Sequence, residues 1–404
     1  MKIKSIIPLD NTADAFAYKS DTQLRKANAL FYLMNQNWLV KLGAKLTELA
    51  VQWKLPVKSL IRSTIFEQFV GGETLTETTD LIEKLNQFNV KVILDYGAEG
   101  KETEADFDNI KEEFIRVISY SASRSNVPLI GIKITALARF ALLEKLNDFA
   151  VVSKFNTVIN TSPLTSSEKE EWDRVVRRTF EICEMAAQKG IGVLIDAEES
   201  WIQNTIDALT MEAMLAFNKE KTVVFNTIQL YRHDRLDFLK LSHVLAVKND
   251  IIFGAKIVRG AYMEKERKRA QEKQETALIQ PDKSASDADF NKAIEFCVQH
   301  LDTISLIVAS HNEYSVQYTI NLLQAANLPL DHPHVHFSQL YGMSDNITFN
   351  LAKAGCHVSK YLPYGPINDV IPYLMRRAQE NSSVAGQTSR ELFLIRKEMQ
   401  RRKL

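Results

Sequence analysis

The chain has 404 residues, of which 45% are apolar and 25% are charged, as in a soluble globular protein of one or two domains. Lysine plus arginine and aspartate plus glutamate both number 50, so no net charge favours nucleic acid or an acidic lipid surface. The three cysteines are odd in number and lack a CxxC pair, which argues against a disulfide framework and a zinc site.

The first part of the chain, residues 1–89, is predicted to be a helical segment. Three apolar-rich stretches, 24–53, 57–70 and 75–88, are separated by Pro56 and by Gly71-Gly72 and show no strand-like alternation. The first ten residues lack the apolar core of a signal peptide, and no apolar run approaches the ~18 residues that span a bilayer. We therefore expect a cytoplasmic protein that contacts a membrane peripherally at most.

From residue 90 onward, short β-branched runs alternate with longer charged segments of helical period. Nearly continuous apolar runs of this kind are typical of parallel strands that are covered on both faces. Eight of them occur, at 90–95, 129–135, 191–196, 223–229, 252–258, 304–310, 335–339 and 356–361. Helices are predicted between them at 106–123, 167–188, 201–218, 288–300, 315–326 and 344–354.

Eight strand–helix units in succession predict an α/β protein with a TIM-type (βα)8 barrel over residues 90–404, preceded by the N-terminal helical segment. The polar stretch 271–287 is expected to be a mobile insertion. In such barrels the chemistry lies at the C-terminal ends of the strands, so polar residues at the strand ends are the candidate site residues.

Lys133 interrupts the second apolar run, and Asp196 ends the third. A lysine that points into a barrel needs a partner, so we predict an ion pair between them. Other strand ends add further polar groups and a small-residue turn, at Gln229, Lys256, Val258, Arg259, Gly260, Ala261, Tyr262, Ser310, His311, Asn312, Leu340 and Tyr361. Because no GxGxxG, GxxxxGK[ST] or HExxH motif is present, a bound dinucleotide would be held by the barrel mouth itself.

Near the C-terminus, Tyr373, Arg376, Arg377 and Glu380 occur at i, i+3, i+4 and i+7, which places them on one face of a predicted helix. Two adjacent guanidinium groups are suited to grip a carboxylate in bidentate fashion. A solvated basic face that Glu380 neutralises is the alternative from spacing alone.

His332, His334 and His336 alternate before and within the seventh run. On a strand they would share one face and, with Asp196, could hold the metal of a hydrolase. The alternative is that they lead into the strand at its N-terminal end, where Pro333 interrupts the ladder.

Several motifs together resemble the proline dehydrogenase family. They are the segments 196–199, 256–262 and 310–312, the pair Gly342-Met343, and Tyr361 followed by 373–381. Residues 69–74 are similar to the longer, eukaryote-type members, and with no aldehyde dehydrogenase region after the barrel the monofunctional form is expected.

The resemblance implies a distorted (βα)8 barrel that binds FAD without a Rossmann fold. It also implies oxidation of L-proline to Δ1-pyrroline-5-carboxylate, with hydride passing from proline C5 to flavin N5 and electrons then passing to a membrane quinone. A sensor that binds an amino acid without turnover is the non-enzymatic alternative, and the oligomeric state is left open.

The resemblance also assigns roles to residues. Arg376 and Arg377 would clamp the proline carboxylate, Glu380 would orient them, and Lys133, Asp196, Leu340, Tyr361 and Tyr373 would line the substrate pocket. Gln229, Lys256, Val258, Arg259, Gly260, Ala261, Tyr262, Ser310, His311 and Asn312 would contact FAD.

Two of these positions distinguish subgroups of the family. Lys256 stands where bifunctional bacterial members usually have arginine, as in the eukaryote-type pattern. Hydroxyproline oxidases have a smaller residue at the position of Tyr361, so this residue favours proline. Hydroxyproline oxidation remains the alternative within the family.

The last residues, 396–404, are strongly basic. Two interpretations are open for them. They could contact anionic lipid at the inner membrane near the quinone, or they could form a solvated, frayed end.

Overall fold

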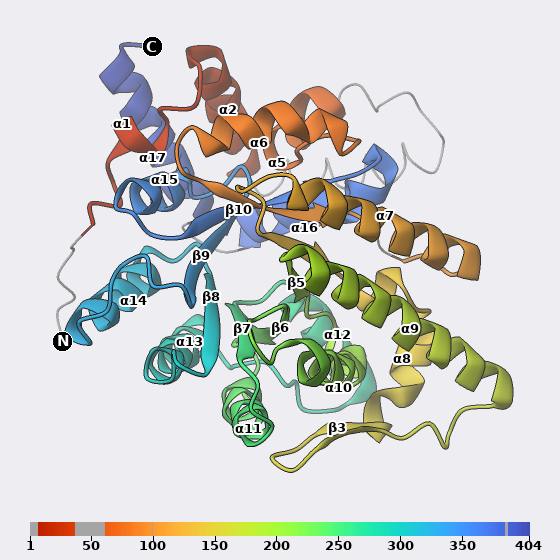
Figure 1. The fold of residues 1–404 in the computed structure, drawn as a ribbon. Helices are drawn as coiled ribbons and strands as arrows, with labels where there is room; N and C mark the ends of the chain where they lie inside the picture. The colour runs from red at the N-terminus through yellow and green to blue at the C-terminus, as the bar shows by residue number, and fades with distance from the viewer. Residues whose placement is uncertain (1–6, 37–60, 99, 384–386) are drawn as a thin grey trace.

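In the computed structural model, residues 7–36, 61–98, 100–383 and 387–404 are described, with the side chains of 378–387 excepted. Within these ranges eight parallel strands close a barrel in chain order, the last pairing with the first. Its strands are β1 (Lys91–Tyr96), β2 (Leu129–Ile132), β5 (Gly192–Ile195), β6 (Val224–Gln229), β7 (Phe253–Val258), β8 (Ile304–Ala309), β9 (Val335–Leu340) and β10 (Val358–Tyr364). All eight predicted strands and the predicted barrel are therefore confirmed (Figure 1).

Helices cover the outside of the barrel and return the chain from each strand to the next. Six predicted helices are confirmed with shifted ends: α7 (Glu104–Ala122), α9 (Ser166–Lys189), α10 (Ser200–Phe217), α13 (Lys283–Val298), α14 (Glu313–Ala325) and α15 (Asp345–Lys353). Their ends follow local signals. For example, α9 begins at a Thr165/Glu168 capping box and ends at Gly190 in the left-handed region.

Some elements were not predicted. These are η3 (Ile134–Ala136), α8 (Phe140–Leu146), η4 (Asn147–Phe149), the hairpin of β3 (Ala150–Val152) and β4 (Thr157–Ile159), α11 (Arg235–Lys248) and α12 (Met263–Lys273). The last turn of α12 and the first turn of α13 take up both ends of the expected mobile insertion 271–287. Its middle is tied to the loop after β6, because Leu278 accepts from His233 and Gln280 donates to Tyr231 through backbone hydrogen bonds of 3.0 and 2.7 Å. The insertion thus has contacts that the sequence did not predict, and its mobility stays a prediction.

The N-terminal segment is helical where it is described. It contains α1 (Thr12–Ala15), α2 (Asp21–Met34), η1 (Arg62–Phe66), α5 (Glu67–Phe69), η2 (Thr76–Thr78) and α6 (Thr79–Asn86). The predicted helix over 37–53 lies outside the described residues, and the division of domains at residue 89 stays a prediction. Ile82 and Leu85 of α6 are buried in the same cluster as β1.

The last two helices, α16 (Ile367–Ser383) and α17 (Gln387–Arg402), follow β10. Figure 1 shows α17, at the blue end of the chain, close to α1 and α2 at the red end. Leu392 and Ile395 of α17 share a buried cluster with Leu24 and Phe31 of α2. Arg402 donates to the backbone carbonyls of Phe16 and Lys19.

The predicted frayed C-terminus is therefore wrong, because the basic tail forms a packed helix. The anionic-lipid role stays a prediction. No helix within the described ranges is both long and apolar enough to cross a membrane.

Candidate active site

The interior of the barrel is set by the alternation of side chains along each strand. A buried apolar layer is formed by Ile93, Leu129, Leu194, Phe225, Ile307 and Tyr361. Residues two positions further along β1, β5 and β6 point inward on the same side, toward the C-terminal mouth. Asp95, Asp196 and Thr227 therefore face the mouth, together with Lys256 of β7 and Lys133 after β2.

Asp196 is the centre of the polar group at this mouth. Lys256 Nζ lies 2.5 Å from Asp196 Oδ1, and the Tyr361 hydroxyl donates to Asp196 Oδ2 at 2.7 Å. Lys133 Nζ lies 3.7 Å from the same Oδ2. The predicted Lys133–Asp196 ion pair is thus confirmed, but Lys256 is the closer partner.

The charges fix the protonation states of this cluster. Burial raises the pKa of Asp196, but Lys256 and Lys133 outweigh this effect and hold it below its usual value. Burial and the nearby Asp196 raise the pKa of the Tyr361 phenol well above its usual value. At neutral pH, Asp196 is therefore an anion and Tyr361 a hydrogen-bond donor. The Lys256 ammonium lies 4.8 Å from the centre of the Tyr361 ring, which fixes the ring from its face.

Asp95, at the end of β1, completes the cluster and was missed. Its Oδ2 lies 3.8 Å from Lys133 Nζ, and its side chain is buried. The signal was present in the sequence, because the first apolar run ends in Asp95 as the third ends in Asp196. The four charged residues Lys133, Lys256, Asp95 and Asp196 balance one another.

Gly131 makes room for Tyr361. A Cβ atom added to Gly131 would lie 2.4 Å from the Tyr361 hydroxyl oxygen, far inside van der Waals contact. We expect Gly131→Ala to displace the Tyr361 ring, break its bond to Asp196 and lower the free energy of unfolding by about 1–3 kcal/mol, as overpacked cores do. Urea unfolding measures this loss. Tyr361→Phe is the matched control, since it removes the hydroxyl and leaves the ring in place. A Gly131→Ala protein as stable as the parent would contradict the tight fit.

A second buried carboxyl group, Glu198, lies just behind Asp196 and was not singled out as a functional residue. It accepts hydrogen bonds from the backbone N–H and the hydroxyl of Thr135. The neighbouring backbone is held by Gln203, which accepts from the Glu198 N–H at 2.7 Å, and by Gln229, which donates to the Glu198 carbonyl at 2.6 Å. Burial raises the pKa of Glu198 to about 7.

This raised pKa gives a pH-dependent prediction. Between the usual carboxyl pKa of 4.5 and about 7, the folded chain holds a proton on Glu198 that the unfolded chain has lost. Stability from this group is therefore present below pH 4.5 and lost as pH rises through 7. We expect Glu198→Gln to remove this loss. The free energy of unfolding of the variant minus that of the parent should therefore be larger at pH 8 than at pH 5.

Urea unfolding of both proteins at pH 5 and pH 8 tests this prediction. Because Glu391 also has a raised pKa of about 7 and is present in both proteins, its effect cancels in the difference. A difference in unfolding free energy that does not change with pH would contradict the assignment.

The end of β7 and the turn after it contain several of the predicted FAD contacts. Val258, Gly260 and Ala261 are accessible at the mouth, whereas Tyr262 is buried at the start of α12. Arg259 donates to Asp287, Ser310 and Ser315 at 2.7 to 2.8 Å. The predicted contacts Arg259 and Ser310 thus lie together, joined by a hydrogen bond across β7 and β8.

The other two predicted contacts after β8 have different partners. His311 Nδ1 lies 2.9 Å from the Ser344 hydroxyl oxygen. Burial, with Lys360 and Arg377 nearby, lowers the pKa of His311 to about 3, so its imidazole is neutral. The Asn312 side-chain oxygen accepts from the backbone of Tyr314 and Ser315 and so caps α14.

Helix α16 brings the predicted carboxylate clamp to the mouth. Tyr373 and Arg377 are buried, and the Arg377 guanidinium lies 5.1 Å from the centre of the Tyr373 ring. Arg377 also acts electrostatically on His311, which follows β8. Leu340 packs against both the barrel layer and the cluster that contains Tyr373. Arg376 is half-buried on the same helix, and the side chain of Glu380 lies outside the described residues.

One buried polar group at the mouth fits a bound cofactor. The Thr227 hydroxyl is buried and has no hydrogen-bond partner among the described residues, although Thr227 pairs in register with Lys256. A buried unpaired hydroxyl is costly, so this one fits a ligand atom. The predicted contacts Gln229, Arg259 and Ser310 carry donor groups, which suits the phosphate and heterocycle oxygens of FAD.

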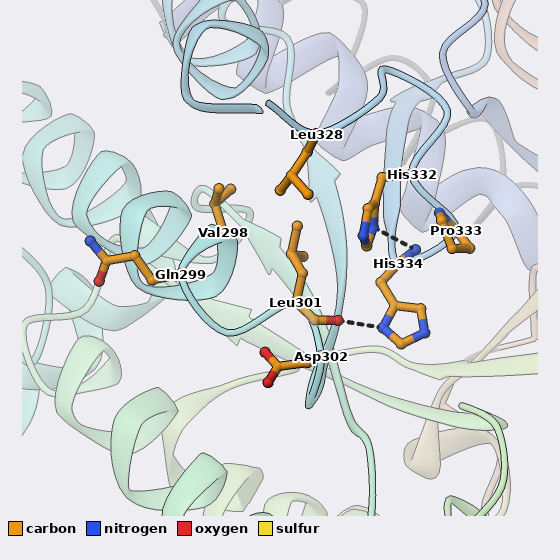
Figure 2. A pocket seen from close by; sticks show the side chains of 8 residues that line it. All are labelled: Val298, Gln299, Leu301, Asp302, Leu328, His332, Pro333 and His334. Atoms are coloured by element: carbon orange, nitrogen blue, oxygen red, sulfur yellow. Dashed lines mark hydrogen bonds between the residues drawn. The ribbon is translucent and has the colours of Figure 1, made fainter. Parts of the chain in front are cut away.

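The three histidines of the alternative metal site lie at the other end of the barrel. Figure 2 shows His332 and His334 lining a cleft of about 450 Å³ beside Leu301 and Pro333. His334 Nδ1 lies 2.6 Å from the Leu301 carbonyl, and His336 Nε2 lies 2.6 Å from the Ser359 hydroxyl. Asp196 follows the C-terminal end of β5, whereas these residues precede or begin β9, so the set proposed for a hydrolase does not converge. Among the described residues no three His, Cys, Asp or Glu side chains are grouped to hold a metal ion.

Comparisons with known proteins point to one family. A sequence model of a family described as proline dehydrogenase matches residues 78–390. Proline dehydrogenase 1, mitochondrial, of Dictyostelium discoideum is 32% identical over 381 residues, which cover 86% of this chain and 66% of the relative. Hydroxyproline dehydrogenase of Xenopus laevis is 31% identical over 96% of this chain and 88% of its own length.

Among solved structures, proline utilization A from Bdellovibrio bacteriovorus, inactivated by N-propargylglycine, superposes with a TM-score of 0.69 at 18% identity. The match covers 93% of this chain and 37% of that one. At this identity the likeness concerns the fold, which is the same barrel.

Proposed function

The chain belongs to the proline dehydrogenase family, and on this premise we propose that it oxidises L-proline to Δ1-pyrroline-5-carboxylate with bound FAD. The observation that supports this best is the convergence of two groups at one mouth. A charge-balanced cluster of Lys133, Lys256, Asp95 and Asp196, with Tyr361, lies inside the barrel. Arg377 of α16 is buried beside Tyr373 and acts electrostatically on His311, which follows β8.

Substrate recognition follows from the charges. Because the two lysines and two aspartates of the cluster offset one another, the arginines of α16 supply the surplus positive charge for an anion. Arg376 and Arg377 would hold the proline carboxylate by charge-assisted hydrogen bonds. Tyr361, Leu340 and Tyr373 would enclose the apolar pyrrolidine ring. An anchored carboxylate fixes the orientation of the ring and of its C5 carbon.

The residues that would hold FAD are those at the ends of β6, β7 and β8. Gln229, Lys256, Arg259, Ser310 and His311 offer the polar contacts, and the Thr227 hydroxyl is available beside them. FAD supplies the hydride acceptor when bound. The protein contributes rigidity, since Asp196 pins the Lys256 ammonium at 2.5 Å and Gln229 is fixed to the Glu198 carbonyl.

In this proposal Asp196 and Tyr361 also keep the charge around the substrate amine constant during the reaction. Oxidation at C5 requires the unprotonated proline amine, whose lone pair assists the departure of hydride. Asp196 remains an anion because Lys256 and Lys133 hold its pKa low, and the Tyr361 hydroxyl stays protonated. The cluster thus keeps a fixed charge while the substrate changes its own. We propose a membrane quinone as the final electron acceptor, and peripheral membrane contact stays a prediction.

An absorbance spectrum of the purified protein before and after anaerobic addition of L-proline tests the proposal. We expect the bands of oxidised flavin to be present and to bleach on addition. Flavin that stays oxidised with L-proline would overturn the proposed substrate, and a folded protein that takes up no added FAD would overturn the proposed cofactor. Reoxidation by a soluble quinone then tests the acceptor.

Hydroxyproline oxidation is the second candidate, because the Xenopus laevis hydroxyproline dehydrogenase is 31% identical over nearly the whole chain. The position of Tyr361 favours proline, since its hydroxyl is held by Asp196 and closely faces Gly131. Bleaching rates with L-proline and 4-hydroxy-L-proline distinguish the two substrates. Tight proline binding without bleaching would instead support the sensor alternative.

A further inference from the structure

The C-terminal helix α17 reaches the site through one side chain, Glu391. Although α17 lies outside the barrel against α1 and α2 (Figure 1), Glu391 is buried. Its Oε1 accepts a hydrogen bond of 2.6 Å from the backbone N–H of Ser344 and lies 3.3 Å from the Ser344 hydroxyl oxygen. The contact is thus with the turn that joins β9 to α15.

This turn is held in an unusual conformation. Ser344 has φ of 51° and Gly342 has φ of 82°, both in the left-handed region that side chains other than glycine disfavour. Gln68 donates to the Gly342 carbonyl at 2.7 Å, and Lys360 donates to the Met343 carbonyl at 2.5 Å. The turn is therefore held from several sides, and its geometry presents the Ser344 hydroxyl to His311.

The Ser344 hydroxyl connects Glu391 to His311. Its oxygen lies 2.9 Å from His311 Nδ1. A carboxylate has no proton to donate, so beside ionised Glu391 the serine hydroxyl donates to Oε1 and its oxygen accepts from His311 Nδ1–H. Because His311 is neutral, its single ring proton is then on Nδ1, and Nε2 has a lone pair.

We propose that Glu391 is a positioning residue which, through Ser344, sets the tautomer of His311 and thereby the affinity of the barrel mouth for FAD. This inference rests on the proposed function, in which His311 contacts the cofactor. With the proton on Nδ1, Nε2 can only accept a hydrogen bond. With the proton on Nε2, the same atom would donate instead. The side chain at position 391 of the last helix thus decides whether His311 Nε2 accepts or donates a hydrogen bond at the end of β8.

The surroundings make the relay sensitive to pH. Burial raises the pKa of Glu391 to about 7, and Asp345 raises it further while Ser344 and Lys360 oppose the shift. Charged or titratable groups that face Glu391 are Asp345, Lys360, Tyr18 and Arg390, and those that face His311 are Lys360 and Arg377. Protonated Glu391 can donate to the Ser344 oxygen, which reverses the direction of both hydrogen bonds.

Nitrogen NMR of the full chain labelled with ¹⁵N-histidine measures the His311 tautomer directly, and a His311→Asn variant assigns its signals. We expect His311 to carry its proton on Nδ1 above pH 7 and to shift toward Nε2 below it. Glu391→Met should remove this pH dependence and move the proton toward Nε2, because the Ser344 hydroxyl, without its carboxylate acceptor, is free to donate to His311 Nδ1. Ser344→Ala should uncouple His311 in the same way while keeping the backbone contact to Glu391.

Glu398→Gln is the matched control. Glu398 is a fully buried carboxylate on the same helix, paired with Arg401 and Arg402, so its loss weakens α17 without touching Ser344. We expect this variant to keep the tautomer and the FAD affinity of the parent. Glu391→Met and Ser344→Ala should each weaken FAD binding about tenfold, as the loss of an outer partner does in other sites, and the double variant should lose no more than either single one.

Unchanged His311 signals in both Glu391→Met and Ser344→Ala would overturn the proposal, and so would an unchanged FAD affinity in both. A change of the same size in Glu398→Gln would also overturn it, since packing of α17 would then be the cause. A chain that binds no flavin would refute the proposed function. The link from Glu391 to His311 would still be tested in that case, because the NMR measurement of the tautomer needs no FAD.

Discussion

Replacing Arg377 by methionine is expected to lower kcat/KM for L-proline by about a thousandfold, which is about 4 kcal/mol of lost transition-state stabilisation. Arg377 is buried against the Tyr373 ring and lies within electrostatic reach of His311. It therefore faces the mouth and not the solvent. A bidentate pair of charge-assisted hydrogen bonds to a carboxylate in a desolvated site has this magnitude.

A second substrate shows whether Arg377 acts on the proline carboxylate or on the cofactor. Pyrrolidine has the ring of proline but no carboxylate, so it cannot use the arginine clamp. We expect Arg377→Met to have little further effect on flavin reduction by pyrrolidine. An equally large loss with both substrates would show that Arg377 acts on the cofactor side. Arg377→Lys should recover only part of the loss, because an ammonium cannot make the planar bidentate pair.

Arg116→Met provides a surface control. Arg116 is an exposed arginine on α7 that pairs with Glu113, so its loss is expected to leave kcat/KM unchanged. Bound FAD, measured by absorbance in each variant, shows that the comparison is made on loaded protein. A kcat/KM in Arg377→Met that equals the parent value would contradict the clamp.

The barrel could be predicted from the sequence because its signals are local. A strand such as 304–310 is apolar except for Ser305 and Ser310, since helices cover its outer face and the interior covers the other. The Lys133–Asp196 pair followed from the same logic, because both residues end neighbouring strands. Asp95 carries the same signal and could have been found by applying the rule to every strand end.

Other features depend on partners that no local pattern reveals. Val244 and Val247 of α11 are exposed, so this helix lacks a clean apolar stripe and was missed. The partner of Lys256, Asp196, was not foreseen, because it lies 60 residues earlier in the chain and two strands away in the barrel. The β3–β4 hairpin has strands of three residues each, which is too short for alternation to be recognised.

The C-terminal tail shows the same limit most clearly. Its basic residues suggested a solvated or lipid-facing end, because nothing nearby in the sequence neutralises them fully. In the fold, Arg402 contacts the carbonyls of Phe16 and Lys19 and the Asp21 carboxylate. These partners precede it by more than 380 residues, so the tail is stabilised by the start of the chain.

The second large effect is expected at a buried ion pair below α17. Lys360 is completely buried on β10, and its ammonium lies 2.8 Å from Asp345 Oδ1. The other oxygen of Asp345 accepts from the Tyr18 hydroxyl at 2.8 Å and lies 3.6 Å from Lys19. Burial raises the pKa of Asp345, but Lys360 and Lys19 outweigh this and hold it below its usual value, so the carboxylate is ionised at neutral pH.

Asp345→Asn is therefore expected to lower the free energy of unfolding at pH 7 by about 3–5 kcal/mol, because it leaves the Lys360 ammonium buried without a counter-charge. Urea unfolding at pH 7 measures the loss. Since the folded pKa of Asp345 is depressed, this stabilisation is present above its usual pKa and disappears only as pH falls through the lower folded value.

Two comparisons test the cause of this loss. The exposed pair Lys26–Glu67 has a similar separation of 2.9 Å, but water screens it, so Glu67→Gln should cost less than about 1 kcal/mol. The double variant Asp345→Asn with Lys360→Met should lose less than Asp345→Asn alone, because the unpaired charge is then absent. If Asp345→Asn cost no more than Glu67→Gln, the buried charge would have to be neutral in the folded chain. A neutral Lys360 would then no longer contribute to the lowered pKa of His311.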